Sequence, residues 1–113
     1  MEYKIVEHLN KWWWGCTFTL IVGDGLGIVE VQFDDNYPSV AFIKGLSVIE
    51  SERQKGLGKE LIDQCVLIAL REQKQFLQLS ANKKKDWLVR WYKRLGFVIY
   101  MTDDNEITML KVL

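Results

Sequence analysis

The sequence contains few of the residues that mark disulfide-rich or metal-binding proteins. It has 2 cysteines, Cys16 and Cys65, and 1 histidine among 113 residues. The cysteines form no CxxC pair and have no histidine at metal-ligand spacing, so we expect free thiols and no metal. Cys65 follows the helical spacing of the apolar residues around it, which favours a core position over a catalytic one.

Long apolar runs are also missing. No stretch approaches the roughly 18 apolar residues that a membrane-spanning helix requires. The first residues do not form a basic segment followed by an apolar one, as a secretory signal would. Hydrophobic residues make up 49% and charged residues 27% of the chain, a balance typical of soluble globular proteins. We therefore expect one cytoplasmic domain over residues 1–113, without membrane association.

The formal net charge is zero, yet the charges are unevenly distributed. Acidic residues outnumber basic residues over 1–48, whereas basic residues strongly outnumber acidic residues over 53–94. This distribution suits a polyanionic ligand bound by the second half of the chain.

Hydrophobic periodicity predicts an α/β (α+β) fold. Alternating or continuous apolar segments predict strands over 3–9, 17–22, 29–33, 40–48, 75–81, 97–101 and 107–113, and apolar residues at helical spacing predict helices over 57–73 and 83–95. Segment 40–48 is apolar on both alternating faces, which predicts a central strand covered on each side. The order strand, helix, strand predicts a right-handed parallel β-α-β crossover. We expect a mixed, mostly antiparallel central sheet of six to seven strands with two main helices.

The second predicted helix carries a stripe of large side chains. Trp87, Leu88, Trp91, Tyr92 and Leu95 share one helical face, so we expect the two tryptophans to be buried. The basic residues of this segment lie largely on the other faces, which is typical of a solvated surface.

A glycine-rich turn follows strand 40–48 and precedes the longer helix. Its residues are Arg53, Gln54, Lys55, Gly56, Leu57 and Gly58. Such a helix start presents free N–H groups and the positive end of the helix dipole, which together bind phosphate. Gly56 and Gly58 have no Cβ, so a ligand can approach the backbone closely, and Lys59 adds positive charge. An ordinary helix start with solvated lysines is the competing interpretation.

Two better-known phosphate motifs do not fit this turn. The Walker pattern requires glycine in place of Arg53 and serine or threonine in place of Glu60. The dinucleotide fingerprint requires glycine in place of Leu61.

Two motifs in this order resemble those of the GNAT superfamily of N-acetyltransferases. Arg53-x-x-Gly56-x-Gly58 looks like its acyl-CoA-binding motif, and Tyr92-Lys93-Arg94-Leu95-Gly96-Phe97 looks like its Tyr-x-x-x-Gly-Phe motif. The resemblance covers about residue 40 to the C-terminus. It implies the acyl-CoA N-acyltransferase fold, acetyl-CoA as co-substrate, and direct transfer of the acetyl group to a primary amine on a small molecule or peptide.

The resemblance also implies where coenzyme A lies. Pantetheine would enter between the strand that ends in Leu46-Ser47-Val48 and the strand over 76–80, with hydrogen bonds to the main chain of Leu46 and Val48. The pyrophosphate would bind the N–H groups of residues 54–59, and Asn82 would contact the cofactor. The implied cofactor residues are Leu46, Ser47, Val48, Arg53, Gln54, Lys55, Gly56, Leu57, Gly58, Lys59 and Asn82.

In the same family, a main-chain N–H near Val48 would stabilise the oxyanion and Tyr92 would act on the leaving thiolate. An unperturbed tyrosine, with a pKa of ~10, is a weaker acid than a thiol at ~8.5, so we expect a supporting hydrogen bond from Tyr92. A purely structural role in the core is the competing interpretation. Four side chains are candidate bases by position, and none is preferred: His8, Glu30, Asp34 and Glu50.

The sequence departs from the family pattern near its start. Family members usually place two helices between the first and second strands, whereas only residues 10–16 are available here. The acceptor side should therefore be open, completed by another subunit, or lined by Trp12, Trp13 and Trp14. We expect these tryptophans to form a homodimer contact.

Two other functions remain open from the sequence. The missing helices would suit an acyl-CoA-binding module with little turnover. The basic segment 83–94 would suit a nucleic-acid-binding protein, although burial of its tryptophans would argue against that.

Overall fold

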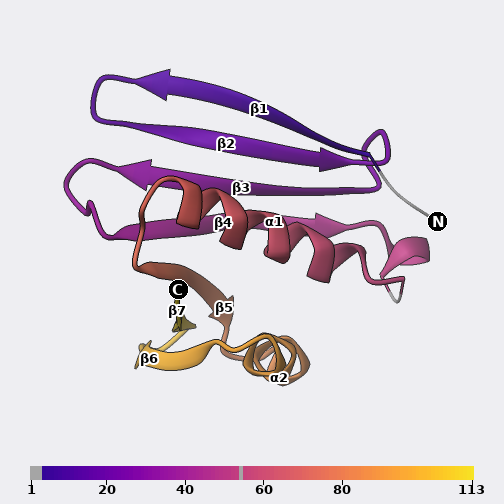
Figure 1. The fold of residues 1–113 in the computed structure, drawn as a ribbon. Helices are drawn as coiled ribbons and strands as arrows, with labels where there is room; N and C mark the ends of the chain where they lie inside the picture. Colours follow the sequence, from indigo (N-terminus) through magenta and orange to yellow (C-terminus); the bar gives the residue numbers. More distant parts are fainter. Residues whose placement is uncertain (1–3, 54) are drawn as a thin grey trace.

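The computed structural model describes residues 4–53 and 55–113. Their elements, in chain order, are β1 (Ile5–Trp12), β2 (Gly15–Val22), β3 (Gly27–Asp34), β4 (Val40–Val48), the 3-10 turn η1 (Glu50–Glu52), α1 (Leu57–Arg71), β5 (Phe76–Asn82), α2 (Asp86–Arg94), β6 (Val98–Thr102) and β7 (Glu106–Val112). The strands form one sheet in the order β1-β2-β3-β4-β5-β7-β6 (Figure 1). This is the mixed sheet with two helices that the sequence predicts.

The connections follow the predicted topology. Strands β1 to β4 form an antiparallel series, β4 and β5 are parallel neighbours joined through α1, and β6 and β7 form the closing hairpin. Within the described residues, β1 and β2 are joined by a tight turn at Trp13 and Trp14 with no helix between them. β1 extends to Trp12, beyond the predicted end at Leu9, and the predicted start at Tyr3 lies outside the described residues.

The buried side chains of the strands belong to one face of the sheet. Directly paired residues on neighbouring strands lie on the same face. Phe18 pairs with Val31, Val31 pairs with Ile43, and all three are buried. The same face continues through Ala41 and its partner Leu77, both fully buried.

Helix α1 covers this face and contacts β2 to β5 (Figure 1). Its buried residues recur at three- and four-residue intervals: Leu57, Leu61, Ile62, Cys65, Ile68 and Ala69. Cys65 is fully buried, as its spacing predicts.

No helix of the described chain packs on the opposite face of the sheet, so this face is bare. Glu30 and Lys44, which pair across β3 and β4, are both exposed on it. Since β1 and β2 are joined by a tight turn, no segment between them is available to cover this surface.

The prediction that segment 40–48 is covered on each side is wrong. Only Ala41 and Ile43 of β4 are buried, and Lys44, Gly45 and Ser47 are exposed. Lys44 is exposed because it lies on the bare face. The exposure of Ser47 follows from a β-bulge, because Glu30 pairs with Lys44 and Ile28 with Ser47, which leaves one extra residue in β4 between the two pairs. The extra residue disrupts the alternation and bends the strand. Gly45, with φ of 59°, takes the left-handed conformation that such a bend favours.

The prediction that both tryptophans of the second helix are buried is also wrong. The buried residues of α2 are Val89 and Tyr92, whereas Trp87 is 59% exposed and Trp91 is half-buried. This short helix packs at the end of β5, so only a narrow strip of it meets the core (Figure 1). The remaining large side chains line the cleft described below.

Candidate functional site: the cleft between β4 and β5

Strands β4 and β5 diverge after a short paired stretch. They pair from Val40 with Phe76 to Phe42 with Gln78. Beyond these residues the structure records no β4–β5 pairing, because the bulge at Gly45 bends β4. The end of β4 therefore presents peptide groups on its β5 side that can bind the amides of an extended ligand.

Two cavities occupy the space between the diverging strands. The larger, of about 710 Å³, lies between the end of β4, the start of α1 and helix α2. The smaller, of about 240 Å³, lies between β4 and the end of β5. They share the lining residues Leu46, Lys85, Leu88 and Tyr92, so they form one continuous cleft.

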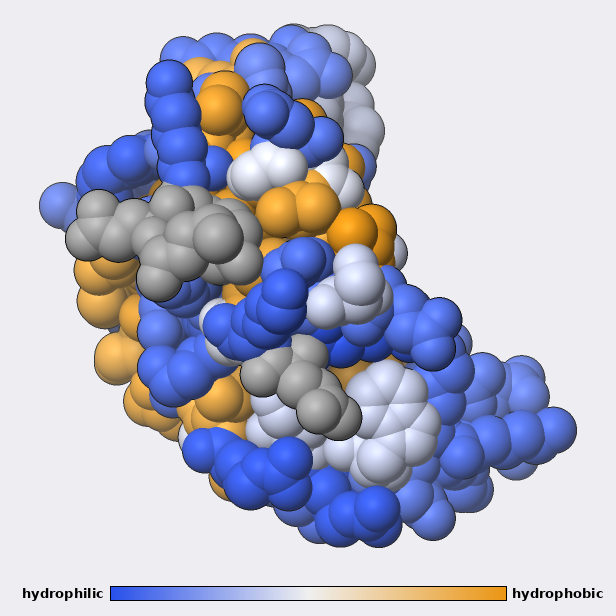
Figure 2. Space-filling model, turned by 90° about the vertical axis from the view of Figure 1, so that its right-hand side faces the viewer, coloured by the Kyte–Doolittle hydropathy of each residue, from blue (hydrophilic) through white to orange (hydrophobic). Residues whose placement is uncertain are grey.

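The helix side of this cleft lies at the end of the molecule that faces the viewer in Figure 2. Apolar and weakly polar surface, shown in orange and white, is bordered there by hydrophilic residues in blue. A ligand with both an apolar part and charged groups matches such a surface.

Helix α1 begins beside the larger cavity with an uncapped N-terminus. Gly56 precedes the helix with φ of 82°, and no side chain caps the helix. Among the described residues, no acceptor is recorded for the N–H groups of Leu57, Gly58 and Lys59. Free N–H groups and the positive end of the helix dipole suit an anion, and phosphate binding at this turn stays a prediction.

Two of the predicted N–H donors differ from this group. The N–H of Lys55 donates to the Glu52 carbonyl oxygen at 3.2 Å and so belongs to the turn. Gln54 lies outside the described residues.

The basic residues near the turn have divided roles. The Lys55 ammonium contacts the Glu52 carboxylate at 3.2 Å, and the Lys59 ammonium contacts Asp63 at 2.8 Å. The exposed Lys59–Asp63 pair contributes little stability, and the Lys55 side chain is itself 57% exposed, so both lysines can still attract an anion. The Arg53 Nε donates to the Val48 carbonyl oxygen at 3.0 Å, which ties the turn to the end of β4.

The positive lining of the larger cavity comes from Arg53, Lys85 and Arg94. Lys85 and Arg94 were not among the predicted cofactor residues. The excess of basic residues over 83–94 was their only signal in the sequence. They reach the cavity because α2 lies beside the start of α1, and no local pattern of the sequence predicts this arrangement.

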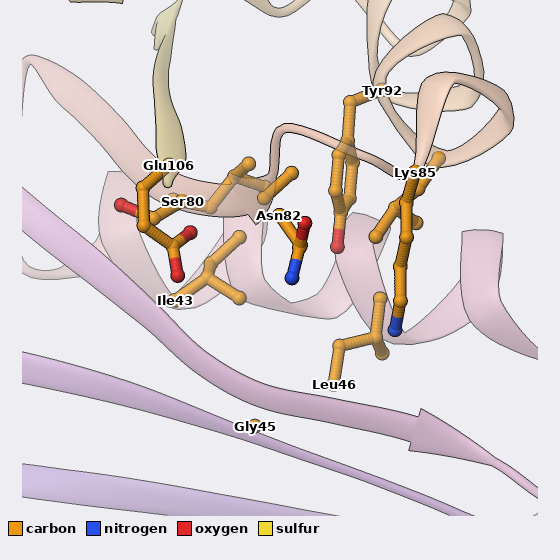
Figure 3. Close-up of a pocket in the computed structure, with 11 residues that line it drawn as sticks. Ile43, Gly45, Leu46, Ser80, Asn82, Lys85, Tyr92 and Glu106 are labelled. Atoms are coloured by element: carbon orange, nitrogen blue, oxygen red, sulfur yellow. The ribbon is translucent and has the colours of Figure 1, made fainter. Parts of the chain in front are cut away.

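Tyr92 lies where the two cavities meet. It is 5% exposed and its ring contacts those of Phe97 and Trp91, with centroid distances of 5.8 Å and 5.2 Å. Its hydroxyl points into the smaller cavity (Figure 3). Burial, and then repulsion from the nearby Cys65 thiol when it ionises, raise the pKa of Tyr92 to about 12. The hydroxyl therefore stays protonated and can donate a hydrogen bond into the cleft.

The end of β5 and the start of β7 supply the polar side of the smaller cavity (Figure 3). Ser80, Asn82 and Glu106 line it. The Asn82 Oδ1 accepts a hydrogen bond from the backbone N–H of Lys84 at 2.9 Å. Asn82 does not line the larger cavity, so its place differs from that of the predicted phosphate-binding residues.

None of the four predicted candidate bases lines either cavity: His8, Glu30, Asp34 and Glu50. Glu106 does line the smaller one, and the sequence analysis missed it. It reaches the cleft because β7 pairs with β5 and places Glu106 opposite Asn82. Only the register of these two strands could have revealed it.

The diverging parallel strands, the uncapped helix start and the buried tyrosine together define an acyl-CoA N-acyltransferase fold. A family model of the acetyltransferase (GNAT) domain matches residues 13–99. The chain therefore belongs to the GNAT acetyltransferase family and is an acetyltransferase.

Solved structures agree on the fold. An acetyltransferase from Bacillus subtilis in complex with CoA is 15% identical, with a TM-score of 0.75 over 97% of this chain and 99% of that one. A GNAT family acetyltransferase from Elizabethkingia anophelis with acetyl-CoA bound is 13% identical, with a TM-score of 0.75 over 96% and 98% of the two chains. Nourseothricin acetyltransferase is 20% identical, with a TM-score of 0.75, and 87% of this chain spans only 65% of it.

The described residues also bear on two other classes of site. No helix is long and apolar enough to cross a membrane. In the same residues, no group of three or more histidine, cysteine or acidic side chains is arranged to hold a metal ion. Since Trp87 is 59% exposed, burial of the tryptophans no longer argues against nucleic-acid binding.

Proposed function

We propose that this protein transfers the acetyl group of acetyl-CoA directly to a primary amine. The observation that carries the proposal is the continuous cleft between β4 and β5, with an uncapped helix start at one end and the Tyr92 hydroxyl at its centre. Such a cleft suits a long ligand with an anionic end and a reactive end.

The pyrophosphate of the coenzyme would bind the first N–H groups of α1, from Gly56 to Lys59. Arg53, Lys85 and Arg94 supply positive charge beside it. Pantetheine would extend along Leu46, Ser47 and Val48, where β4 still pairs with β3 but has no partner on its β5 side. The Val48 carbonyl already accepts a bond from Arg53, and its second lone pair remains available.

The reaction requires the amine nitrogen to attack the thioester carbonyl carbon, after which the carbon–sulfur bond breaks. A main-chain N–H near Val48 would hold the developing oxyanion. Tyr92 would donate a hydrogen bond to the leaving thiolate. Since its pKa is raised to about 12, this hydrogen bond is favoured over full proton transfer.

Direct transfer also agrees with the state of the buried thiol. Burial raises the pKa of Cys65 to about 12, which keeps it protonated and poorly nucleophilic. Cys16 lines neither cavity. A covalent acetyl-cysteine intermediate therefore has no suitable residue in the cleft.

We further propose a single cytoplasmic domain that forms homodimers through the β1–β2 turn. Trp13 is 93% exposed and Trp14 is 41% exposed there, which is unusual for residues of this size. Sedimentation of wild type and Trp13→Ser tests the dimer. A shift to monomer in the variant is expected, and identical sedimentation coefficients would contradict the contact.

The acetyl transfer itself is tested with a panel of primary amines scored by release of free thiol from acetyl-CoA. Wild type should release thiol with at least one amine. Tyr92→Phe should keep its coenzyme affinity and lose about 100-fold in kcat, because it lacks the donor to the leaving group. Tyr100→Phe, on exposed β6, is the matched control and should behave as wild type.

Two outcomes would change the assignment. Weaker coenzyme binding with an unchanged rate in Tyr92→Phe would make the residue purely structural. Thermal stabilisation by acetyl-CoA without thiol release from any amine would favour the acyl-CoA-binding module, an alternative that the bare acceptor side supports.

A further inference from the structure

The charged residues of the cleft are sorted along its length. The larger cavity carries only positive charge among its described lining residues, from Arg53, Lys85 and Arg94. The smaller cavity contains Lys85, shared with the larger one, and Glu106. Glu106 is thus the single acidic side chain among the described residues that line either cavity. The end of the cleft remote from the helix start is the one place suited to a cation.

The smaller cavity is lined by residues from both faces of the sheet. Ile43 and Leu79 line it from the buried face. Asn82 and Glu106 are directly paired residues on β5 and β7 and therefore share a face. That face is the bare one, since both are exposed while their neighbours Ala81 and Ile107 are buried and half-buried. The cleft consequently reaches the side of the sheet without helices.

The backbone of Glu106 is held firmly, whereas its carboxylate is unengaged. The Asp103 carboxylate accepts hydrogen bonds from the N–H groups of Asn105 at 2.8 Å and Glu106 at 2.7 Å. These two bonds hold the turn and lower the pKa of Asp103. Among the described residues, no hydrogen bond or ion pair is recorded for the Glu106 side chain.

Figure 3 shows how Glu106 lies relative to the other polar groups. Its carboxylate points toward β4 from the start of β7, and Tyr92 and Asn82 lie between it and Lys85. The apolar side chains of Ile43 and Leu79 line the same space. A small molecule with a hydrocarbon part and a terminal ammonium matches this combination.

We propose that Glu106 is the residue that receives the acceptor: its carboxylate binds the ammonium of a small primary amine entering through the bare face and takes its first proton. This inference rests on the proposed acetyl transfer. The neutral nitrogen then attacks the thioester carbon, the carbon–sulfur bond breaks, and the sulfur leaves as thiolate. The amide nitrogen releases its second proton to that thiolate through solvent, and Glu106 returns its proton to water.

The test uses two amines of similar size and different charge. Benzylamine is an ammonium ion near neutral pH, whereas aniline is neutral. Each is titrated by NMR into CoA-saturated wild type, Glu106→Gln and the control Asp104→Asn, which alters an exposed acid of the same turn outside the cleft. We expect Glu106→Gln to bind benzylamine at least 10-fold more weakly and aniline with wild-type affinity. Equal benzylamine affinity in wild type and Glu106→Gln would overturn the proposal.

Turnover supplies the second readout. In Glu106→Gln, kcat/KM for benzylamine should fall about 100-fold, while the value for aniline should stay within about threefold of wild type. Equal losses with both amines would overturn the role, because a disturbed structure would affect them alike. If wild type binds CoA and benzylamine but acetylates neither amine, acetyl transfer fails, and the binding comparison still decides the role of Glu106.

Discussion

The two halves of β4 differ from each other in strand pairing and in burial. The first half pairs with both β3 and β5, and its residues Ala41 and Ile43 are buried. The second half is bulged at Gly45, pairs only with β3, and borders the cleft. One strand thus stabilises the sheet at one end and opens it at the other.

This difference indicates that the site is made by removing strand pairing rather than by adding a loop. The first half fixes the distance between β4 and β5, and the bulge sets where they separate. We therefore expect substitutions near the paired half to act on stability and substitutions near the open half to act on ligand binding or rate.

The largest effect is expected from Leu77→Ala beside the paired half. Leu77 is fully buried and pairs with Ala41. The cavity left by its side chain should lower the free energy of unfolding by about 2–5 kcal/mol. Urea unfolding measures this change. Coenzyme affinity of the remaining folded protein should be unchanged, and a large loss of affinity would break the division between the halves.

Gly56→Val should lower coenzyme affinity and leave the fold intact, the reverse of what Leu77→Ala should do. At φ of 82° a β-branched residue is strained, and the turn before α1 must rearrange. We expect CoA affinity to fall about 100-fold, or roughly 2.7 kcal/mol, by calorimetry. Gly25→Val, at φ of 100° in the distant β2–β3 turn, is the matched control for strain. Full affinity in Gly56→Val would exclude this turn as the phosphate site.

The free energy of unfolding should also depend on pH, through the buried thiol of Cys65. The Cys65 pKa is raised by burial from 9.0 to about 12, so this contribution to stability is complete below about pH 9 and is lost as pH rises toward 12. Between these values the unfolded chain loses a proton that the folded chain keeps. At about pH 10.5 the loss should be of order 2 kcal/mol. Urea unfolding at about pH 8 and 10.5 should show a smaller difference in Cys65→Ala than in wild type.

Gly45→Ala tests the bulge itself. The left-handed backbone at φ of 59° should cost alanine about 1 kcal/mol of stability, although its added carbon meets nothing within 4 Å. We expect acetyl transfer to fall further than this cost explains, since relaxing the strain moves the end of β4. Gly25→Ala carries similar strain without touching the cleft and should keep full activity. Equal activities in the two variants would remove the bulge from the mechanism.

The smallest effect is expected at the rim of the open half. Arg94→Ala should weaken CoA binding only a few-fold, because exposed charges are screened by solvent. The loss should shrink further at high salt. Arg90→Ala, on the same helix but outside the cleft, should leave affinity unchanged in the same titration.

Local sequence signals predicted the elements and the glycine turn before α1 because both depend on neighbouring residues. Alternation in segment 29–33 and helical spacing around Cys65 each report a single element. The turn at Gly56 could be predicted for the same reason, since a glycine and the following helix define it.

The failures all depend on contacts between distant segments. The exposure of Ser47 follows from a register shift between β3 and β4, and the exposure of Trp87 follows from how little of α2 meets the sheet. Glu106 reaches the cleft through its pairing with Asn82. No period within one segment contains this information, so the sequence did not show that Glu106 lines the cleft.

The contact of the cleft with both faces of the sheet bears on the order in which the substrates bind. If coenzyme enters beside α1 and the amine enters beside Glu106, neither substrate blocks the entry of the other. Both must still be present together, so initial-rate plots at several fixed amine concentrations should intersect rather than run parallel. The two products can then dissociate in either order.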